Sequence, residues 1–180
     1  MQLAILSDIH DHVWNLAKAL KFIEKAEVLI VCGDLCSPFI ISQLGEGFAG
    51  AIHIVFGNND GDAFRMTRNA SRYPHLKLHG ELFEGDLEGV KFAANHYPEI
   101  AASLAQSGRF EVVCCGHNHD YAIRQQSGIF LLNPGTVMGY NPIKGCDVPP
   151  SLILFDMQRK HAQGFQLSTG GEWTLIETIR

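Results

Sequence analysis

The stretch VVCCGHNHD, residues 112–120, is an apolar run that ends in two histidines separated by a single residue. Valine and cysteine are typical of a buried strand, whereas His117 and His119 are polar and follow that strand directly. Gly116 allows a sharp turn between the strand and the histidines. The stretch therefore predicts a strand that delivers two histidines to a functional loop, and the rest of the chain should supply their partners.

Five apolar, β-branched runs of this kind lie along the chain, at residues 3–7, 27–32, 51–56, 90–94 and 110–115. Continuous rather than alternating apolar character indicates strands that are buried on both faces by helices. Helical patterns follow the first and fourth runs, at residues 13–26 and 98–108. After residue 120, shorter strands alternate with turns rich in Gly, Pro and Asn.

The whole pattern predicts an α/β fold with a more antiparallel second half. We expect residues 1–119 to supply most of one sheet, and residues 120–180 to complete a second.

Length and composition favour a single globular domain over residues 1–180, with 46% hydrophobic and 18% charged residues. A net charge of −5 gives no reason to expect a strong nucleic-acid surface, and no apolar run is long enough to predict a membrane span. The five cysteines are an odd number without a regular framework, which favours a reducing compartment. We therefore expect a cytoplasmic protein without a membrane partner.

Polar side chains follow every one of the five buried runs. In chain order these side chains are Asp8 and His10; Asp34; Asn58, Asn59 and Asp60; His96; and His117 and His119. In open α/β sheets, ligands bind beyond the carboxyl ends of the strands, so these tips can converge. Carboxylate, amide and imidazole groups are ligands for divalent metals. The sequence therefore predicts a metal centre at the strand ends.

Each tip also has a simpler interpretation. Asp8 could cap the following helix, Gly33 and Asp34 could form a turn, and Asn58 could adopt left-handed backbone. Five such coincidences in one order are improbable, so we favour the metal centre.

The order D-x-H, G-D, G-N-x-D, H and G-H-x-H over residues 8–119 resembles the calcineurin-like metallophosphoesterases. The similarity is greatest to the small single-domain branch of bacterial and archaeal phosphodiesterases, which includes the retromer subunit of this fold. The segment LLNPGTV, residues 131–137, resembles a segment of that branch. The resemblance implies a four-layer αββα sandwich, in which two mixed β-sheets are flanked by helices.

The resemblance also implies a dinuclear metal site. Asp34 would bridge two ions that share a water or hydroxide nucleophile. The first ion would be held by Asp8, His10 and His119, and the second by Asn58, His96 and His117. Manganese is the expected metal, with iron, zinc or nickel as alternatives. Two divalent ions, two carboxylates and a hydroxide leave about one net positive charge, which suits a phosphodiester anion.

The candidates for catalytic roles are Asp34, Asn59 and His12. Many family members have a histidine at the position of Asn59, and an amide cannot transfer a proton at neutral pH. His12 could replace that proton donor, or it could be a solvated loop residue. We expect Asp60 to orient a neighbouring histidine ligand.

Several other residues could take part but have a simpler role open to them. Thiolate chemistry is conceivable for three cysteines within the apolar runs, but buried structural cysteine is favoured; these are Cys32, Cys114 and Cys115. Three arginines at near-helical spacing could contact a substrate phosphate or line a solvated helix face; these are Arg65, Arg68 and Arg72. Four histidines without a motif are expected at the rim or surface; these are His53, His75, His79 and His161.

Two functions remain open at this point. The first is a metal-dependent phosphodiesterase, monomeric or homodimeric, that acts on a small-molecule or nucleotide diester. The second is a protein-interaction scaffold with weak or no catalysis, as in the retromer subunit.

Overall fold

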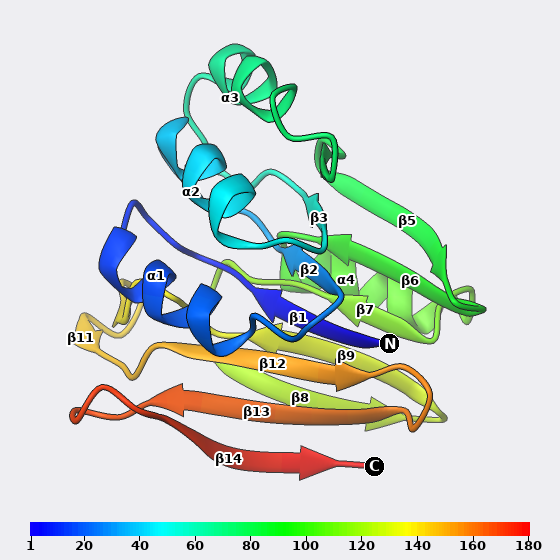
Figure 1. The fold of residues 1–180 in the computed structure, drawn as a ribbon. Coiled ribbons are helices and arrows are strands. Elements are labelled where there is room, and N and C mark those ends of the chain that lie inside the picture. The colour runs from blue at the N-terminus through cyan, green and yellow to red at the C-terminus, as the bar shows by residue number, and fades with distance from the viewer.

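The computed structural model describes all 180 residues, and it shows two β-sheets packed face to face with helices on both outer faces (Figure 1). The larger sheet contains β1 (Gln2–Leu6), β2 (Val28–Val31), β3 (Ala51–Ile54), β4 (Leu76–Leu78), β12 (Ser151–Asp156), β13 (His161–Leu167) and β14 (Trp173–Ile179). The smaller sheet contains β5 (Leu82–Leu87), β6 (Val90–Asn95), β7 (Val112–Cys114), β8 (Tyr121–Gln126) and β9 (Ile129–Pro134). A short hairpin is formed by β10 (Tyr140–Asn141) and β11 (Cys146–Asp147).

The strand order is β14-β13-β12-β1-β2-β3-β4 in the larger sheet and β5-β6-β7-β9-β8 in the smaller one. Both sheets are mixed. In the larger sheet β1, β2, β3 and β4 are parallel to one another, whereas β12, β13 and β14 are each antiparallel to their neighbours in the sheet. In the smaller sheet β6, β7 and β9 are parallel, and β5 and β8 are antiparallel to their neighbours. The predicted αββα sandwich of two mixed sheets is confirmed.

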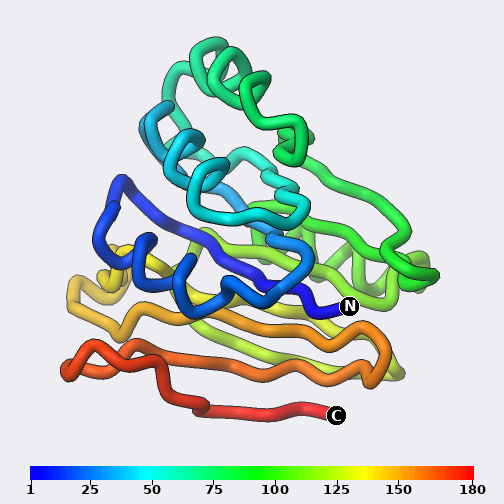
Figure 2. The backbone as a smooth tube through the Cα atoms, in the orientation of Figure 1, coloured from blue at the N-terminus to red at the C-terminus, as the bar shows by residue number.

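The predicted division of the chain between the sheets was wrong. Only β8 and β9 from the second half join the smaller sheet, whereas β12, β13 and β14 return to the larger one. Strand β12 lies antiparallel to β1, with Leu3 opposite Phe155. Figure 2 shows this return, since the orange segment runs beside the blue N-terminal strand and the red end forms the far edge of the same sheet. The apolar run of β12 needs cover on both faces, and a place beside β1 provides it.

Alternate residues of β1 belong to different cores. Ala4 and Leu6 pack with the helices on the outer face, while Leu3 and Ile5 pack between the two sheets. All four side chains are fully buried. This period of two explains why the run looks continuously apolar in the sequence.

Four helices cover the outer faces: α1 (Val13–Phe22), α2 (Phe39–Gly47) and α3 (Ala63–Ala70) on the larger sheet, and α4 (Pro98–Gln106) on the smaller one. The helices predicted at residues 13–26 and 98–108 are α1 and α4, each slightly shorter than expected. Helix α2 was not predicted, because Gly45 and Gly47 weaken helical propensity. No helix combines the length and apolar character that crossing a membrane requires.

The parallel strands decide where the loops lie. The carboxyl ends of β1, β2 and β3 share one edge of the larger sheet, and those of β6 and β7 share one edge of the smaller sheet. In Figure 1 the chain leaves β1 and β2 on the side of the molecule from which α1 and α2 begin. The five predicted ligand loops therefore follow strands that end in the same region.

Candidate metal centre

One group of ligand atoms is formed by Asp8, His10 and His119, which all lie within 4.8 Å of one another. Oδ1 of Asp8 lies 3.3 Å from Nε2 of His119 and 3.8 Å from Nε2 of His10. The two Nε2 atoms are 3.1 Å apart. Because Nδ1 of His119 faces the carbonyl of Tyr140, which can only accept, Nδ1 carries the proton and Nε2 offers its lone pair to this space.

A second group is formed by Asn58, His96 and His117. Nδ1 of His96 donates to the carbonyl of Cys32 at 2.7 Å, which leaves Nε2 free as a ligand atom. This Nε2 lies 3.1 Å from Oδ1 of Asn58 and 3.3 Å from Nδ1 of His117. Oδ1 of Asn58 in turn lies 2.9 Å from Nδ1 of His117, so two imidazole nitrogens and one amide oxygen converge.

Asp34 lies between the two groups. Its Oδ2 is 3.5 Å from Nε2 of His10 in the first group and 3.5 Å from Nε2 of His96 in the second. Asn59 fixes the carboxylate by donating its backbone N–H to Oδ1 and its side-chain amide to Oδ2, both at 2.8 Å. Asp34 is therefore the carboxylate that pairs with a histidine of each group.

The buried Oδ1 of Asp8 has no hydrogen-bond donor in the structure. An unsatisfied buried oxygen costs about 1–3 kcal/mol, and more when the group is charged. Lone pairs of His10 and His119 face the same space. A divalent cation would satisfy all three groups, so the residues present fit a metal ion at this position.

Both carboxylates favour the ionised form. Burial opposes ionisation of Asp8, but the imidazole rings of His10, His119 and His96 around it outweigh burial and hold its pKa below the usual range. Burial also opposes ionisation of Asp34, but the imidazole of His96 beside it and the hydrogen bonds from Asn59 outweigh burial and hold its pKa well below the usual range. Two negative charges are thus held at the centre of the site, ready for cations.

Left-handed backbone occurs at five of the seven predicted ligands. The positive φ angles are those of Asp8 (53°), His10 (43°), Asp34 (55°), His117 (74°) and His119 (57°). Such angles are costly outside glycine and persist where the surroundings enforce them, often at functional sites. Asn58 has no positive φ, so the proposal that it merely tolerates left-handed backbone was wrong.

Asp60 fastens the loop of Asp34. Its Oδ2 accepts the N–H of Asp34 at 3.1 Å and that of Gly57 at 2.7 Å, and its Oδ1 accepts those of Leu35 and Cys36. The expectation that Asp60 orients a histidine ligand was wrong. Its carboxylate instead satisfies four backbone N–H groups and so positions the loop of Asp34.

Glycine is required at two motif positions for close approach. A Cβ on Gly57 would lie 2.2 Å from Oδ1 of Asp34, and a Cβ on Gly116 would lie 1.8 Å from Oγ of Ser7. Neither glycine has a positive φ. The expected role of Gly116 in a sharp turn is therefore replaced by a steric one: no other residue lets the ligand loops pack this closely.

Three residues near the ligands were not assigned a role from the sequence. Oγ1 of Thr136 donates to the carbonyl of Asp8 at 2.8 Å, and Nδ2 of Asn133 donates to the carbonyl of Gly116 at 3.0 Å. Both belong to the segment LLNPGTV, which was the only signal for them. Sγ of Cys36 lies 3.4 Å from Nδ1 of His10, and burial raises the pKa of this thiol to about 12.

His12 caps helix α1: its Nδ1 accepts the N–H of Asn15 at 3.2 Å. The alternative that Asp8 caps this helix was therefore wrong. The ring of His12 also meets that of Trp14 edge to face, with the centroids 5.7 Å apart. Because Nδ1 accepts, the neutral ring carries its proton on Nε2.

The remaining candidates mostly take the simpler roles. The three cysteines of the apolar runs are buried, as expected: Cys32, Cys114 and Cys115. The three arginines on and after α3 are exposed, and one of them pairs with Asp62; these are Arg65, Arg68 and Arg72. His53 and His79 stack on each other at the edge of the larger sheet, away from the ligands.

The model of the calcineurin-like phosphoesterase superfamily domain matches residues 1–160. The phosphodiesterase MJ0936 of Methanocaldococcus jannaschii is 27% identical over 164 residues, which are 89% of this chain and 95% of that protein. A solved archaeal phosphodiesterase superposes with a TM-score of 0.83 at 26% identity, over 93% of this chain and 100% of that one.

Vacuolar protein sorting 29 from Cryptosporidium parvum has the same fold, with a TM-score of 0.75 at 18% identity over 99% of this chain and 97% of that one. The match to the superfamily covers the five ligand loops and most of both sheets. The chain therefore belongs to the calcineurin-like phosphoesterase superfamily.

Proposed function

We propose that the protein is a metal-dependent phosphodiesterase with a dinuclear centre. The observation that carries the proposal is the position of Asp34, whose Oδ2 lies at equal distance from a histidine of each ligand group. The ligands would be Asp8, His10, Asp34 and His119 for one ion, and Asp34, Asn58, His96 and His117 for the other. When bound, the two ions would supply Lewis acidity and a hydroxide nucleophile to the reaction.

The donor set contains carboxylates, imidazoles and one amide oxygen, whereas Sγ of Cys36 lies beside Nδ1 of His10 and not beside its candidate ligand atom Nε2. Such a set suits manganese, iron, zinc or nickel, and we propose manganese. The five cysteines are all free, which supports a reducing compartment such as the cytoplasm.

Charge favours a diester over a monoester. Two bound divalent ions would bring four positive charges, and the two carboxylates and a hydroxide would bring three negative ones, which would leave about one positive charge for the substrate. No Lys or Arg occurs in the five ligand loops to add to it. A diester monoanion matches this charge, whereas a monoester dianion is left partly uncompensated.

The leaving group receives little help from a proton donor. Asn59 uses both its backbone and side-chain N–H groups to hold Asp34, and an amide does not transfer a proton. The one candidate that can do so is His12, through Nε2. Substrates with good leaving groups should therefore react fastest.

The second candidate, a protein-interaction scaffold, is favoured by the fold similarity to vacuolar protein sorting 29. Metal binding does not distinguish an enzyme from a scaffold, because vacuolar protein sorting 29 from Entamoeba histolytica has been solved with zinc. Hydrolysis of a phosphoester does distinguish them. The metal-loaded protein should hydrolyse bis-p-nitrophenyl phosphate faster than p-nitrophenyl phosphate and lose both activities in chelator, whereas a scaffold would hydrolyse neither.

A further inference from the structure

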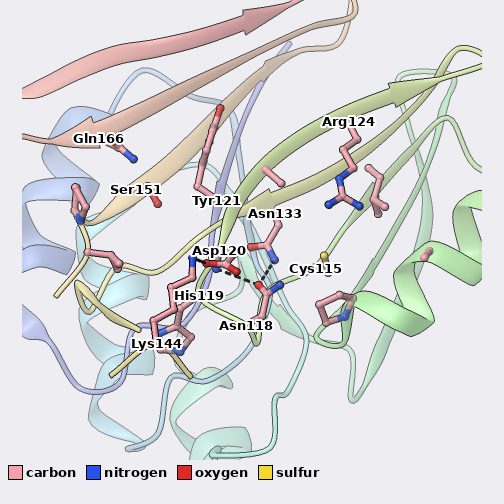
Figure 3. A pocket seen from close by; sticks show the side chains of 16 residues that line it. Cys115, Asn118, His119, Asp120, Tyr121, Arg124, Asn133, Lys144, Ser151 and Gln166 are labelled. Carbon is pink, nitrogen blue, oxygen red and sulfur yellow. Dashed lines mark hydrogen bonds and ion pairs between the residues drawn. The ribbon is translucent and has the colours of Figure 1, made fainter. Parts of the chain in front are cut away.

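A cavity of about 540 Å³ lies beside the loop that carries His117 and His119 (Figure 3). Its walls come from α4, from β8 and β9, and from the segment that follows β10. Asn118 and His119 line it, so one loop forms part of the proposed metal centre and part of this wall. The volume is that of a site for a small ligand.

Asn118 lines the cavity, lies between the candidate ligands His117 and His119 in the sequence, and is held in place by hydrogen bonds. Its Oδ1 accepts from Nδ2 of Asn133 at 2.9 Å and from the N–H of Asp120 at 3.1 Å. Its carbonyl accepts from Nδ2 of Asn141 at 3.1 Å. A molecule bound at the metal centre would therefore meet a preformed edge, with the cavity beyond it.

The lining joins an apolar floor to charged walls. Ala102, Cys115 and Leu131 supply apolar surface, and Lys144 and Arg124 supply two positive charges. Burial raises the pKa of the Cys115 thiol, so it adds no negative charge.

The two cations differ in what they contact. Lys144 is paired with Asp120, whereas Arg124 has no hydrogen-bond acceptor or carboxylate partner anywhere in the structure. In Figure 3 the guanidinium of Arg124 lies above Asn133 and Cys115. The cavity thus has one uncompensated positive charge, in a chain whose net charge is −5.

We propose that this cavity binds the non-reacting arm of the diester substrate, and that this arm carries a ring and a second anionic group. The ring lies on the apolar floor, and Arg124 pairs with the anion. A planar guanidinium with free N–H groups suits a phosphate or carboxylate. The inference rests on the proposed phosphodiesterase function, because it places the reacting phosphate at the metal centre beside Asn118.

The test compares two substrates with the same leaving group, thymidine 5′-(p-nitrophenyl phosphate) with and without a 3′-phosphate. The 3′-phosphate should lower KM about two- to fivefold, the range for an exposed ion pair, and should leave kcat nearly unchanged. Arg124→Gln should abolish the difference. Arg159→Gln removes the same charge from an exposed loop outside the cavity and should keep it.

A second variant tests the space itself. Ala102→Phe would fill the cavity from α4, while Ser103→Phe adds the same side chain on the exposed face of that helix. Only Ala102→Phe should raise KM for the thymidine esters, and neither should change KM for methyl p-nitrophenyl phosphate. Thermal unfolding of both variants shows whether they fold. The test with Arg124→Gln is independent of that result, because Arg124 is exposed and its replacement does not disturb the core.

Equal KM values for the two thymidine esters, or a difference that survives Arg124→Gln, would overturn the proposal. If none of the esters is hydrolysed by the metal-loaded protein, the phosphodiesterase function fails instead. Calorimetric titration with thymidine 3′,5′-bisphosphate then tests the cavity independently of turnover. If Arg124→Gln binds the bisphosphate more weakly than Arg159→Gln does, the proposed ligand site in the cavity is supported. Equal affinity of the two variants contradicts it.

Discussion

Replacing Gly57 by alanine should disable the metal centre without removing a single ligand. The added methyl group would lie 2.2 Å from Oδ1 of Asp34 and 2.8 Å from Cε1 of His96. Ordinary contact begins near 3.4 Å, so the overlap with Asp34 is about 1 Å. Asp34 is held by Asn59 and His96 by the carbonyl of Cys32, so neither can move freely.

The cost follows from this rigidity. Overpacking of a close-packed region typically costs about 1–3 kcal/mol, which corresponds to a fall of several degrees in the melting temperature for a chain of this length. A displaced Asp34 should also weaken metal binding about 10- to 100-fold, the range for changes that disturb the orientation of a metal ligand.

Gly61→Ala is the matched control in the same loop. A Cβ at this position meets only the carbonyl of Cys36, at 3.6 Å, and Gly61 has no positive φ. Equilibrium dialysis with metal analysis measures binding, and urea unfolding measures stability. If Gly57→Ala binds metal as tightly as Gly61→Ala, the close approach of this loop to Asp34 is not needed and the reasoning is refuted.

Three further changes test other parts of the site and fold. Asn59→His should narrow the rate difference between p-nitrophenyl and alkyl leaving groups about tenfold or more, because a proton donor is restored; an unchanged ratio in steady-state assays contradicts this. Thr136→Val should destabilise the protein by about 1–2 kcal/mol in urea unfolding, since the carbonyl of Asp8 loses a donor, and wild-type stability would exclude the role. Burial and His79 lower the pKa of His53 to about 4, so the unfolded chain binds more protons between about pH 6.5 and 4, and stability falls as the pH falls. His53→Leu should reduce this loss of unfolding free energy by about 2 kcal/mol, allowing for the partial exposure of His53. If the unfolding free energies of the wild type and the variant changed in parallel with pH, this role of His53 would be contradicted.

The convergence of the candidate ligands could be predicted because each of them follows an apolar run. Asp8 comes directly after such a run, Asp34 follows one glycine later and His96 one asparagine later. A buried parallel strand places its carboxyl end at the edge where ligands bind. The pairing of β12 with β1 could not be predicted. An apolar run shows that a strand is buried, but its partner depends on contacts between distant parts of the chain.

The residues that support the ligands were harder to predict. Asp60 binds four backbone N–H groups, and backbone groups leave no pattern in the side-chain sequence. Cys36 meets His10 from another loop, so their separation along the chain carries no signal.

Helix α3 has eight residues, a length at which periodicity hardly differs from chance.

The dinuclear phosphodiesterase is tested most directly by titrating metal-free protein with manganese while following hydrolysis of bis-p-nitrophenyl phosphate. The account predicts that activity rises mainly with the second equivalent and levels off at about two ions per chain. Asp34→Asn, which removes the charge shared by both ligand groups, should abolish that plateau. Full activity at one equivalent, or activity that persists in chelator, would contradict the account.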